Sequence, residues 1–375
     1  MGININLERG QLLGALSGLQ SVTGKKGTIA ILSNVLLETG DSSITLTATD
    51  LEIGLKINVP AEILSPGAMT LPARKMLEIV REAANSTIHI EEKENNWIKI
   101  EEGSSHYNMA GTGADEYPSF PSFAEDGFVT IASEILTDLI EKTIVSVANE
   151  GESQFNLTGA LLENEEKGGE NFLRMVSSDG HRLSLMERKL SNTILFEPSR
   201  KIIIPKKGLL EIKKIAEAND TFSFSVEEKQ AVVKTEDTLL IIRLLNGEFP
   251  DYKNIINILD EKNFILVNRI RLMNSMKRMN LFTEDRFNVV NLKINKKSIN
   301  LFSQSADIGN ANDKIDVEYN GDELSLYFNG RYFIDSLNVL SCENVKLFIS
   351  SERSPCFIQS TEEEGFLSVI MPMKL

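Results

Sequence analysis

A nucleophile, an acid, a base and a guanidinium stand together in one short segment of this chain, Ser178-Asp179-Gly180-His181-Arg182. Serine hydrolases combine Ser, His and Asp, but their three side chains converge from separate elements. Neighbours along one strand or turn cannot converge in this way. The spacing therefore favours a turn or bulge at Gly180, with Asp179 and Arg182 fixing local hydrogen bonds. A hydrolase that uses Asp179 and His181 is the least favoured alternative.

Other signatures of catalysis are missing from the sequence. The three histidines, His89, His106 and His181, are scattered along the chain and do not spell out a metal site. No phosphate-binding P-loop and no GxGxxG, GxSxG or HExxH pattern occurs. Acidic pairs such as Glu163 and Glu165 are typical of solvated loops. We therefore expect no catalytic residue, no metal and no cofactor, in a protein that is not an enzyme.

The composition is that of a soluble globular protein. Its 375 residues are 42% apolar and 25% charged, which excludes wholesale disorder and predicts two or three domains. No apolar run approaches the roughly 20 residues of a membrane span. Cys342 and Cys356 form no CxxC pair, and residues 1–7 are no hydrophobic leader, so we expect reduced thiols in the cytoplasm. The net charge of −15 argues against binding of nucleic acid by a uniformly charged surface.

Similar segments recur three times at long intervals. They are 71–80 (LPARKMLEIV), 204–213 (IPKKGLLEIK) and 328–337 (FNGRYFIDSL). The matching positions Pro72, Pro205 and Asn329 are 133 and 124 residues apart. Such a period is far too long for a solenoid and predicts three whole domains of one fold, at 1–125, 126–253 and 254–375. Each domain would be α+β, with two helices packed on antiparallel sheets. The alternative is that weak α+β patterns look alike in any chain.

Positive charge gathers on the predicted helices, which lie at 6–22, 71–83, 132–148, 204–218, 265–281 and 328–340. Together they carry a net charge of +5, which leaves −20 for the rest of the chain. Arg74, Lys207 and Arg331 occupy the same place in their repeats. A base that recurs by internal symmetry suits a repetitive polyanion. Ordinary solvated helix faces are the alternative.

Four motifs carry a resemblance to a known family: SDGHRL at 178–183, FPDY at 249–252, CENV at 342–345 and MPMKL at 371–375. With these motifs in register, the whole chain resembles the bacterial DNA polymerase III beta subunits, the sliding clamps. The resemblance implies a head-to-tail homodimer whose two chains of three domains form a closed ring. Helices would line the hole and sheets would form the outer wall. Such a ring encircles double-stranded DNA without reading its sequence and gives the replicative polymerase its processivity.

The resemblance also implies a hydrophobic groove between the second and third domains. In the family this groove takes short motifs of the replicative polymerase alpha subunit, the clamp loader, other polymerases and repair proteins. Methionine suits such a groove because its deformable side chain accepts many partners. The matching residues here are Leu157, Ser178, Gly180, His181, Arg182, Leu183, Pro250, Phe287, Asn329, Tyr332, Val369, Ile370, Met371, Pro372 and Met373. Plain strand packing is the alternative for the apolar tail.

Two further sets of residues follow from the resemblance and the charge pattern. For DNA we expect contacts from Lys25, Lys26, Arg74, Lys207, Lys213, Arg269, Arg271 and Arg331. For the dimer we expect Tyr107 and Met109 to meet Leu281 and Phe282 of a second chain; alternate apolar positions suit an edge strand, although 107 and 109 could also face a core. The protein would be a cytoplasmic bacterial one, associated with the nucleoid during replication and not with a membrane. A protein–protein scaffold without a DNA function is the remaining rival.

Overall fold

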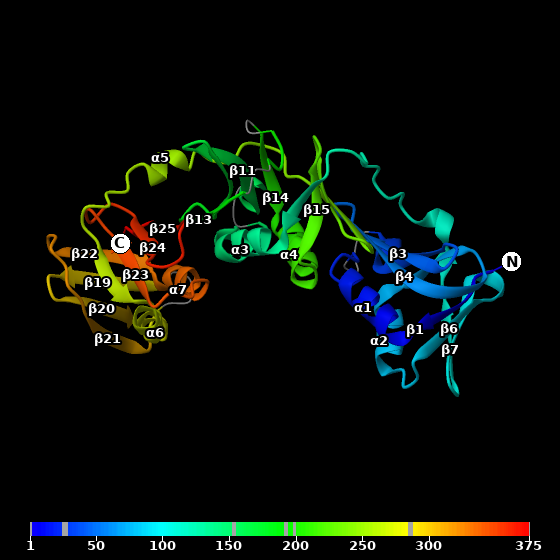
Figure 1. Cartoon of the computed structure of the whole chain (residues 1–375). Coiled ribbons are helices and arrows are strands. Elements are labelled where there is room, and N and C mark those ends of the chain that lie inside the picture. Colours follow the sequence, from blue (N-terminus) through cyan, green and yellow to red (C-terminus); the bar gives the residue numbers. More distant parts are fainter. Residues whose placement is uncertain are drawn as a thin grey trace. The chain divides into compact units, whose positions relative to one another are not determined.

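A β-α-β-β-β unit recurs six times in the computed structural model, which describes residues 2–24, 29–151, 155–190, 194–197, 200–283 and 288–374 (Figure 1). The first two units are β1 (Asn4–Glu8), α1 (Arg9–Leu19), β2 (Asn34–Thr39), β3 (Ser43–Thr49) and β4 (Ile53–Ser65), then β5 (Ala68–Pro72), α2 (Ala73–Glu82), β6 (Thr87–Glu92), β7 (Trp97–Glu102) and β8 (Ser105–Ala110). The next two are β10 (Val129–Ala132), α3 (Ser133–Thr143), β11 (Gly159–Lys167), β12 (Glu170–Ser178) and β13 (Arg182–Lys189), then β14 (Lys201–Pro205), α4 (Lys206–Ala218), β15 (Thr221–Val226), β16 (Gln230–Lys234) and β17 (Thr238–Arg243).

The last two units complete the chain. They are β18 (Ile265–Asn268), α6 (Arg269–Asn280), β19 (Val289–Asn295), β20 (Ser298–Ser305) and β21 (Gly309–Asp316), then β22 (Leu324–Asn329), α7 (Gly330–Asn338), β23 (Asn344–Phe348), β24 (Cys356–Ser360) and β25 (Phe366–Ile370). Short elements lie between them: η1 (Ala30–Ser33), η2 (Glu94–Asn96), β9 (Thr112–Gly113), η3 (Ala114–Glu116), η4 (Ile144–Ser146), η5 (Phe155–Leu157) and α5 (Lys253–Ile256).

Each of the six long helices follows its strand without an intervening residue. In α1, α6 and α7 the side chain of the last strand residue caps the helix start. Asn268 and Asn329 do this by accepting the backbone N–H of Arg271 and Arg331, as N-cap side chains do. Pro72 and Pro205 end the equivalent strands β5 and β14. The Pro or Asn that opens each repeat in the sequence is therefore the joint between a strand and a helix.

Two consecutive units exchange their first strands. The sheet β14-β11-β12-β13 takes its first strand from the following unit, and β10-β15-β16-β17 takes its first strand from the preceding one. The first and second units exchange first strands in the same way, which gives β5-β2-β3-β4 and β1-β6-β7-β8. The fifth and sixth units do so as well, which gives β22-β19-β20-β21 and β18-β23-β24-β25. The helices pack in the pairs α1 with α2, α3 with α4, and α6 with α7. The predicted class, α+β with helix pairs and antiparallel sheets in three domains of one fold, is confirmed.

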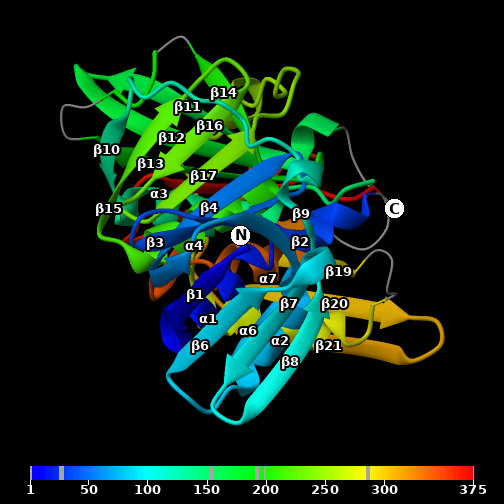
Figure 2. The same cartoon turned by 90° about the vertical axis from the view of Figure 1, so that its right-hand side faces the viewer.

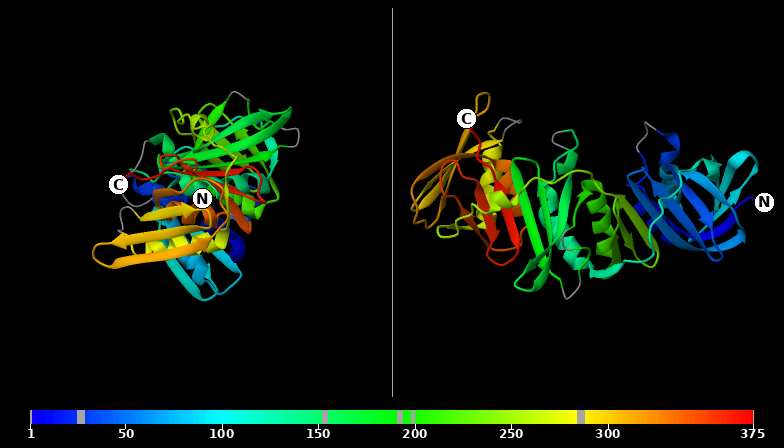
Figure 3. Two further views of the ribbon diagram at one scale, coloured as in Figure 1. Left: turned by 90° about the vertical axis from the view of Figure 1, so that its left-hand side faces the viewer. Right: turned by 90° about the horizontal axis from the view of Figure 1, so that it is seen from above.

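Sheets continue across the junctions between these pairs of units. Strand β17 pairs antiparallel with β4, and β25 pairs antiparallel with β13, where Leu183 lies opposite Val369. Figure 3 shows the red C-terminal strand, β25, beside green strands, of which β13 is its hydrogen-bonded neighbour. By its contacts the chain divides into Met1–Ile131 with Asn219–Arg243, and Ala132–Ala218 with Leu244–Leu375. In the first compact unit β1, β6, β7 and β8 lie side by side (Figure 2).

Several local predictions can be compared with these coordinates. All six predicted helices are present, each a few residues shorter than expected. Gly180 has a φ of +90°, and the Asp179 carboxylate accepts the amides of His181 and Arg182, as predicted for the turn. The two cysteines are free and buried. In the part of the chain that the structure describes, no helix is long and apolar enough to cross a membrane.

The β13–β25 junction has one apolar and one small polar face. Leu183, Leu185, Leu367 and Val369 join a buried cluster that includes Tyr252. On the alternate positions Ser184 faces Ser368 across the junction. Their hydroxyls bond to those of two further buried serines, Ser146 at 2.7 Å and Ser336 at 2.8 Å. The buried hydroxyls therefore satisfy one another.

An ion pair reinforces the same junction. The buried ammonium of Lys142, on α3, donates to the carbonyl of Val339 at the C-cap of α7 and to the Glu363 carboxylate. Burial acts to raise the pKa of Glu363, but hydrogen bonds from Lys142 and from the amides of Ser341 and Cys342 outweigh it and lower this pKa. The carboxylate is therefore ionised at neutral pH, and the pair holds α3 against the end of α7.

Replacing the buried lysine tests this junction. Lys142→Met leaves Glu363 unpaired, and we expect the free energy of unfolding to fall by about 3–5 kcal/mol at pH 7. Lys75→Met is the control, because Lys75 pairs with Glu78 on an exposed helix face, where an ion pair adds little to stability. Urea unfolding followed by circular dichroism gives both values. Equal losses in the two variants would show that the Lys142 pair does not stabilise the junction.

The same pair predicts a pH dependence. Since the folded-state pKa of Glu363 is lowered, its contribution is complete above the ordinary glutamate pKa of about 4.3 and disappears as the pH falls through the lowered value. The difference between wild type and Lys142→Met should therefore shrink in acid.

Candidate functional site

Basic side chains occupy the first turns of helices where acids are normally preferred. Of the six long helices only α3 has an acid in its first turn. Bases stand there in the others: Arg9 in α1, Arg74 in α2, Lys206 and Lys207 in α4, Arg269 and Arg271 in α6, and Arg331 in α7. A cation at a helix N-terminus opposes the helix dipole and costs about 0.3–1 kcal/mol. These bases therefore do not stabilise the helices that they begin, whereas helix start and base together attract an anion.

Arg74, Lys207 and Arg331 are each the second residue of their helix. This bears out their equivalence in the sequence repeats. The Arg74 side chain is 84% exposed and, among the described residues, forms an ion pair with Glu78 on the same helix. Arg331 is exposed as well, and Lys207 is half-buried. Two of the three therefore present their charge to solvent, as a contact to DNA would require; the contact itself stays a prediction.

The other bases assigned to DNA lie in more constrained surroundings. Lys213 pairs with Glu141 at 2.8 Å, and Arg271 pairs with Asp313 at 2.8 Å. Burial acts to raise the pKa of Asp313, but hydrogen bonds from Arg278, Ser275 and Arg271 lower it strongly. Lys25 and Lys26 lie outside the described residues.

Arg269 has a structural partner that the sequence did not reveal. Its guanidinium donates to the carbonyls of Cys342 at 2.7 Å and Leu337 at 3.1 Å, and so closes the end of α7. Arg9 does the same for α2 through the carbonyls of Val80 and Arg81. A contact of Arg269 with DNA would have to coexist with these bonds.

His181, Arg182 and Tyr332, three of the residues assigned to the peptide groove, line one cavity of about 550 Å³. The Arg182 guanidinium lies 4.5 Å from the centre of the Tyr332 ring. It also pairs with Asp335 at 2.7 Å and with Asp179 at 2.9 Å. Arg182 thus joins the turn before β13 to helix α7. Lys206 and Arg331 line the same cavity, which places basic groups beside these residues.

The C-terminal tail runs from β25 toward the next sheet. The amide of Met371 donates to the carbonyl of His181 at 2.9 Å, and the amide of Met373 donates to the carbonyl of Tyr327 at 2.7 Å. The Met371 side chain is 40% exposed, and Pro372 and Met373 are half-buried. Val369 and Ile370 are fully buried strand residues. Strand packing therefore explains the burial of Val369 and Ile370 but not the exposed side chain of Met371.

The remaining groove residues divide into buried and accessible ones. Leu157 and Leu183 are buried, so they could only form the floor of a groove. The apolar cluster that contains Leu183 and Val369 is covered in part by five half-buried side chains of the chain segment after β17: Leu245, Phe249, Ile255, Ile256 and Leu259. Pro250 is exposed and lines another cavity of about 420 Å³.

Three groove residues have local partners or lie outside the described part. The Ser178 hydroxyl donates to the carbonyl of Arg182, and the Asn329 side chain caps α7. Phe287 lies outside the described residues. The groove assignment as a whole stays a prediction.

Among the strands that end the β-α-β-β-β units, β8 and β21 have no partner from another unit in the described structure, and β8 carries Tyr107 and Met109. Tyr107 is half-buried, but Met109 is only 9% exposed within its own chain. Leu281, at the C-cap of α6, is 70% exposed, and Phe282 beside it is half-buried. Leu281 is thus the assigned interface residue with the most apolar surface left to cover.

One expectation about charged residues is wrong. Glu163 and Glu165 are not solvated loop residues, because both lie in β11, where Arg174 stands opposite Glu163. Glu163 is buried and accepts the Tyr252 hydroxyl; Arg174 pairs with both acids. His89 and His106, which are separate in the sequence, flank Glu101 on three adjacent strands. Pairing across strands joins residues that sequence distance separates.

Comparison with known proteins assigns the whole chain to one family. Residues 3–121, 130–251 and 259–374 match the N-terminal, central and C-terminal domains of the DNA polymerase III beta subunit. The beta sliding clamp of Haemophilus influenzae is 29% identical over 379 residues and 100% of both chains. A sliding clamp from Bacillus subtilis is 27% identical with a TM-score of 0.91, and one from Pseudomonas aeruginosa bound to griselimycin is 26% identical with a TM-score of 0.90; both comparisons cover 100% of each chain.

Proposed function

Because this chain belongs to the DNA polymerase III beta subunit family, we propose that it is a DNA sliding clamp, an accessory subunit without catalysis that makes the replicative polymerase processive. The observation that carries this proposal is the placement of the exposed bases Arg74 and Arg331 in the first turns of α2 and α7, where they oppose the helix dipole. We assign the domains to 1–125, 126–253 and 254–375. The protein would work in the cytoplasm, at the DNA.

A closed ring follows from the way the sheets are joined inside the chain. At both internal junctions the last strand of one unit pairs with the last strand of another, β17 with β4 and β25 with β13. Strands β8 and β21 are the equivalent last strands that have no such partner in the described structure. Pairing of β8 in one chain with β21 in the next satisfies both edges. Two chains joined head to tail in this way close a ring.

The proposed junction predicts the effect of a charge at Leu281. Leu281→Glu places a carboxylate where an apolar side chain would be covered, at a cost of at least about 3 kcal/mol, so the dimer should dissociate at least about 100-fold more readily. Leu51→Glu is the matched control, since Leu51 is also an exposed leucine, on the turn between β3 and β4. Light scattering coupled to size exclusion measures both. A Leu281→Glu protein as dimeric as the control would refute this interface.

Inside the ring, the helix starts would contact phosphate. Contacts from Arg74, Lys207 and Arg331 to the DNA backbone carry no sequence information, so the ring can slide. The strongly negative remainder of the chain repels DNA from other surfaces. DNA is then held by the closed ring and not by high affinity. The rival scaffold without a DNA function gives no reason for the exposed bases Arg74 and Arg331 at helix starts.

Charge reversal at the helix starts separates function from stability. In the triple variant Arg74→Glu, Lys207→Glu and Arg331→Glu, the amount retained on nicked circular DNA after loading by a clamp loader should fall at least about tenfold, because each lost phosphate contact weakens binding. The free energy of unfolding should stay within about 1 kcal/mol, since acids suit a helix start. The control reverses three exposed lysines elsewhere, Lys189, Lys229 and Lys296. Equal retention of the two triple variants would show that these helix starts do not contact DNA.

Partner proteins would dock on the second compact unit. We assign this role to the turn Ser178–Arg182, Tyr332 and the tail around Met371, where exposed or half-buried side chains lie beside the apolar cluster of Leu183 and Val369. A peptide with aliphatic and aromatic side chains could extend that cluster. The replicative polymerase, the clamp loader, other polymerases and repair proteins that carry such motifs are the proposed partners.

Peptide binding tests the docking site without DNA. A fluorescent peptide with a glutamine, a leucine and a Leu-Phe pair should bind saturably in an anisotropy titration. Deletion of residues 371–375, or Tyr332→Ala, should weaken binding at least about tenfold, because each removes surface beside the cluster. Trp97→Ala is the control for loss of an exposed aromatic ring, on β7. Unchanged affinity in both the deletion and Tyr332→Ala would place the peptide elsewhere.

A further inference from the structure

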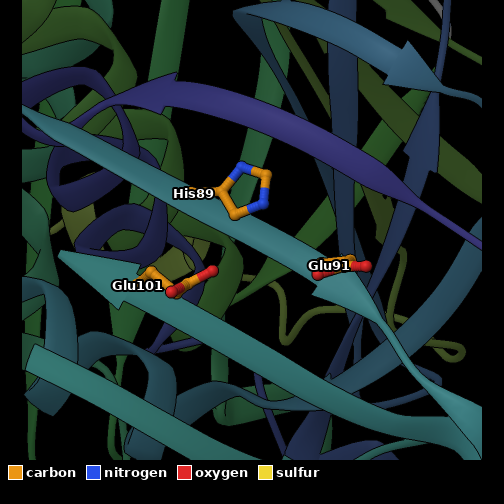
Figure 4. A group of neighbouring side chains, drawn as sticks. All are labelled: His89, Glu91 and Glu101. Atoms are coloured by element: carbon orange, nitrogen blue, oxygen red, sulfur yellow. The ribbon is translucent and has the colours of Figure 1, made fainter.

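Four polar residues form a straight row across four adjacent strands. Asn6 on β1 lies opposite His89 on β6, His89 lies opposite Glu101 on β7, and Glu101 lies opposite His106 on β8. Glu91 is two residues after His89 on β6 and therefore shares its face of the sheet. Figure 4 shows the His89 ring and the two carboxylates on neighbouring strands of this face. Two of the chain's three histidines meet here.

The distances in this group suit a shared ion. One ligand atom each from His89, Glu91 and Glu101 lies within 4.8 Å of the other two, and all three residues are half-buried. Nδ1 of His106 lies 2.8 Å from a carboxylate oxygen of Glu101. Small side-chain rotations could bring these atoms to about 2.0–2.2 Å from one ion.

The second observation concerns the tautomer of His89. The Asn6 side-chain nitrogen donates to Glu62 at 2.8 Å, so the Asn6 oxygen is the atom that faces Nδ1 of His89, also at 2.8 Å. An oxygen only accepts, and therefore Nδ1 carries the proton and Nε2 keeps its lone pair. In Figure 4 one ring nitrogen is turned to the side of the two carboxylates. A hydrogen bond of this kind, behind the ring, is how metal-binding histidines are oriented.

Lysines now neutralise the two carboxylates. Lys99 lies 2.9 Å from Glu101, and Lys93 lies 2.5 Å from Glu91. Ion pairs that remain partly accessible to solvent, as these two do, contribute little to stability. A divalent cation could therefore displace both lysines at little cost.

We propose that His89, Glu91 and Glu101 bind a divalent zinc-type ion, with His106 as a further ligand. Imidazole nitrogen together with carboxylate oxygen is a ligand set that suits Zn²⁺, whereas Mg²⁺ and Ca²⁺ take oxygen ligands. The ion ties together β6, β7 and β8, the last three strands of their sheet. His89, Glu91 and Glu101 lie on β6 and β7 and are not among the residues assigned to DNA, to peptide or to the dimer, whereas His106 lies on β8, the strand proposed to pair with a second chain.

Zinc titration of the chelator-treated full-length protein tests the site. In competition with a chromophoric chelator, wild type should bind one Zn²⁺ per chain at this site, and His89→Ala should bind it at least about tenfold more weakly. His89→Gln provides the same test if the alanine variant does not fold. Millimolar Mg²⁺ should not displace the zinc, because it has no preference for imidazole. Displacement by Mg²⁺, or equal zinc affinity in wild type and both His89 variants, would overturn the proposal.

Matched controls separate this site from the many other acids of the chain. Glu101→Gln should weaken zinc binding, whereas Glu94→Gln, an exposed glutamate of the same region, should not. Asn6→Ala should weaken it by about 10–100-fold, because the ring of His89 loses its orienting partner. Zinc should also slow amide exchange in Ser105–Ala110 of wild type but not of His89→Ala. Equal slowing in both proteins, or an effect of Glu94→Gln as large as that of Glu101→Gln, would show adventitious binding to surface acids.

Discussion

Pairing between the last strands of the β-α-β-β-β units is the constraint on which this structure depends. A strand at the end of a sheet exposes unpaired N–H and C=O groups, and it needs a neighbour or protection. The chain solves this twice internally, where β17 adds to β4 and β25 adds to β13. Buried side chains complete the junction between β13 and β25, where the Lys142 pair and the serine hydroxyls lie.

The same geometry decides which groups are available for function. Each strand runs directly into its helix, so each unit presents a helix start at its strand end. The chain fills most of these starts with bases, although a base there opposes the helix dipole. A few of these bases are used internally: Arg9 and Arg269 close the end of the paired helix. Arg74 and Arg331 remain exposed and are the better candidates for phosphate.

Much of the local structure could be predicted from single residues. Pro72, Pro205 and Asn329 marked strand–helix joints because each fixes or caps the backbone where a helix begins. Gly180 marked a turn because its φ of +90° is one that other residues rarely adopt.

What the sequence left hidden depends on long-range pairing. The repeat of half the domain length escaped detection, because its six copies share a fold but little sequence. The sequence predicted Glu163 to be a solvated loop residue, because it does not show that Arg174 and Tyr252 lie beside this carboxylate. His89 and His106 are 17 positions apart and meet only because β6, β7 and β8 are neighbours. No local pattern reports which strands of a sheet are adjacent.

Cross-linking between the two free edges tests ring closure most directly. Asn108 on β8 and Asn312 on β21 are exposed, and the two native cysteines are buried, so Asn108→Cys and Asn312→Cys place the reactive thiols of the double variant at the edges. With a short bismaleimide we predict a covalent dimer on a denaturing gel, in which position 108 of each chain is joined to position 312 of the other. Cross-links within one chain only, or none under conditions where the protein is folded, would contradict the ring.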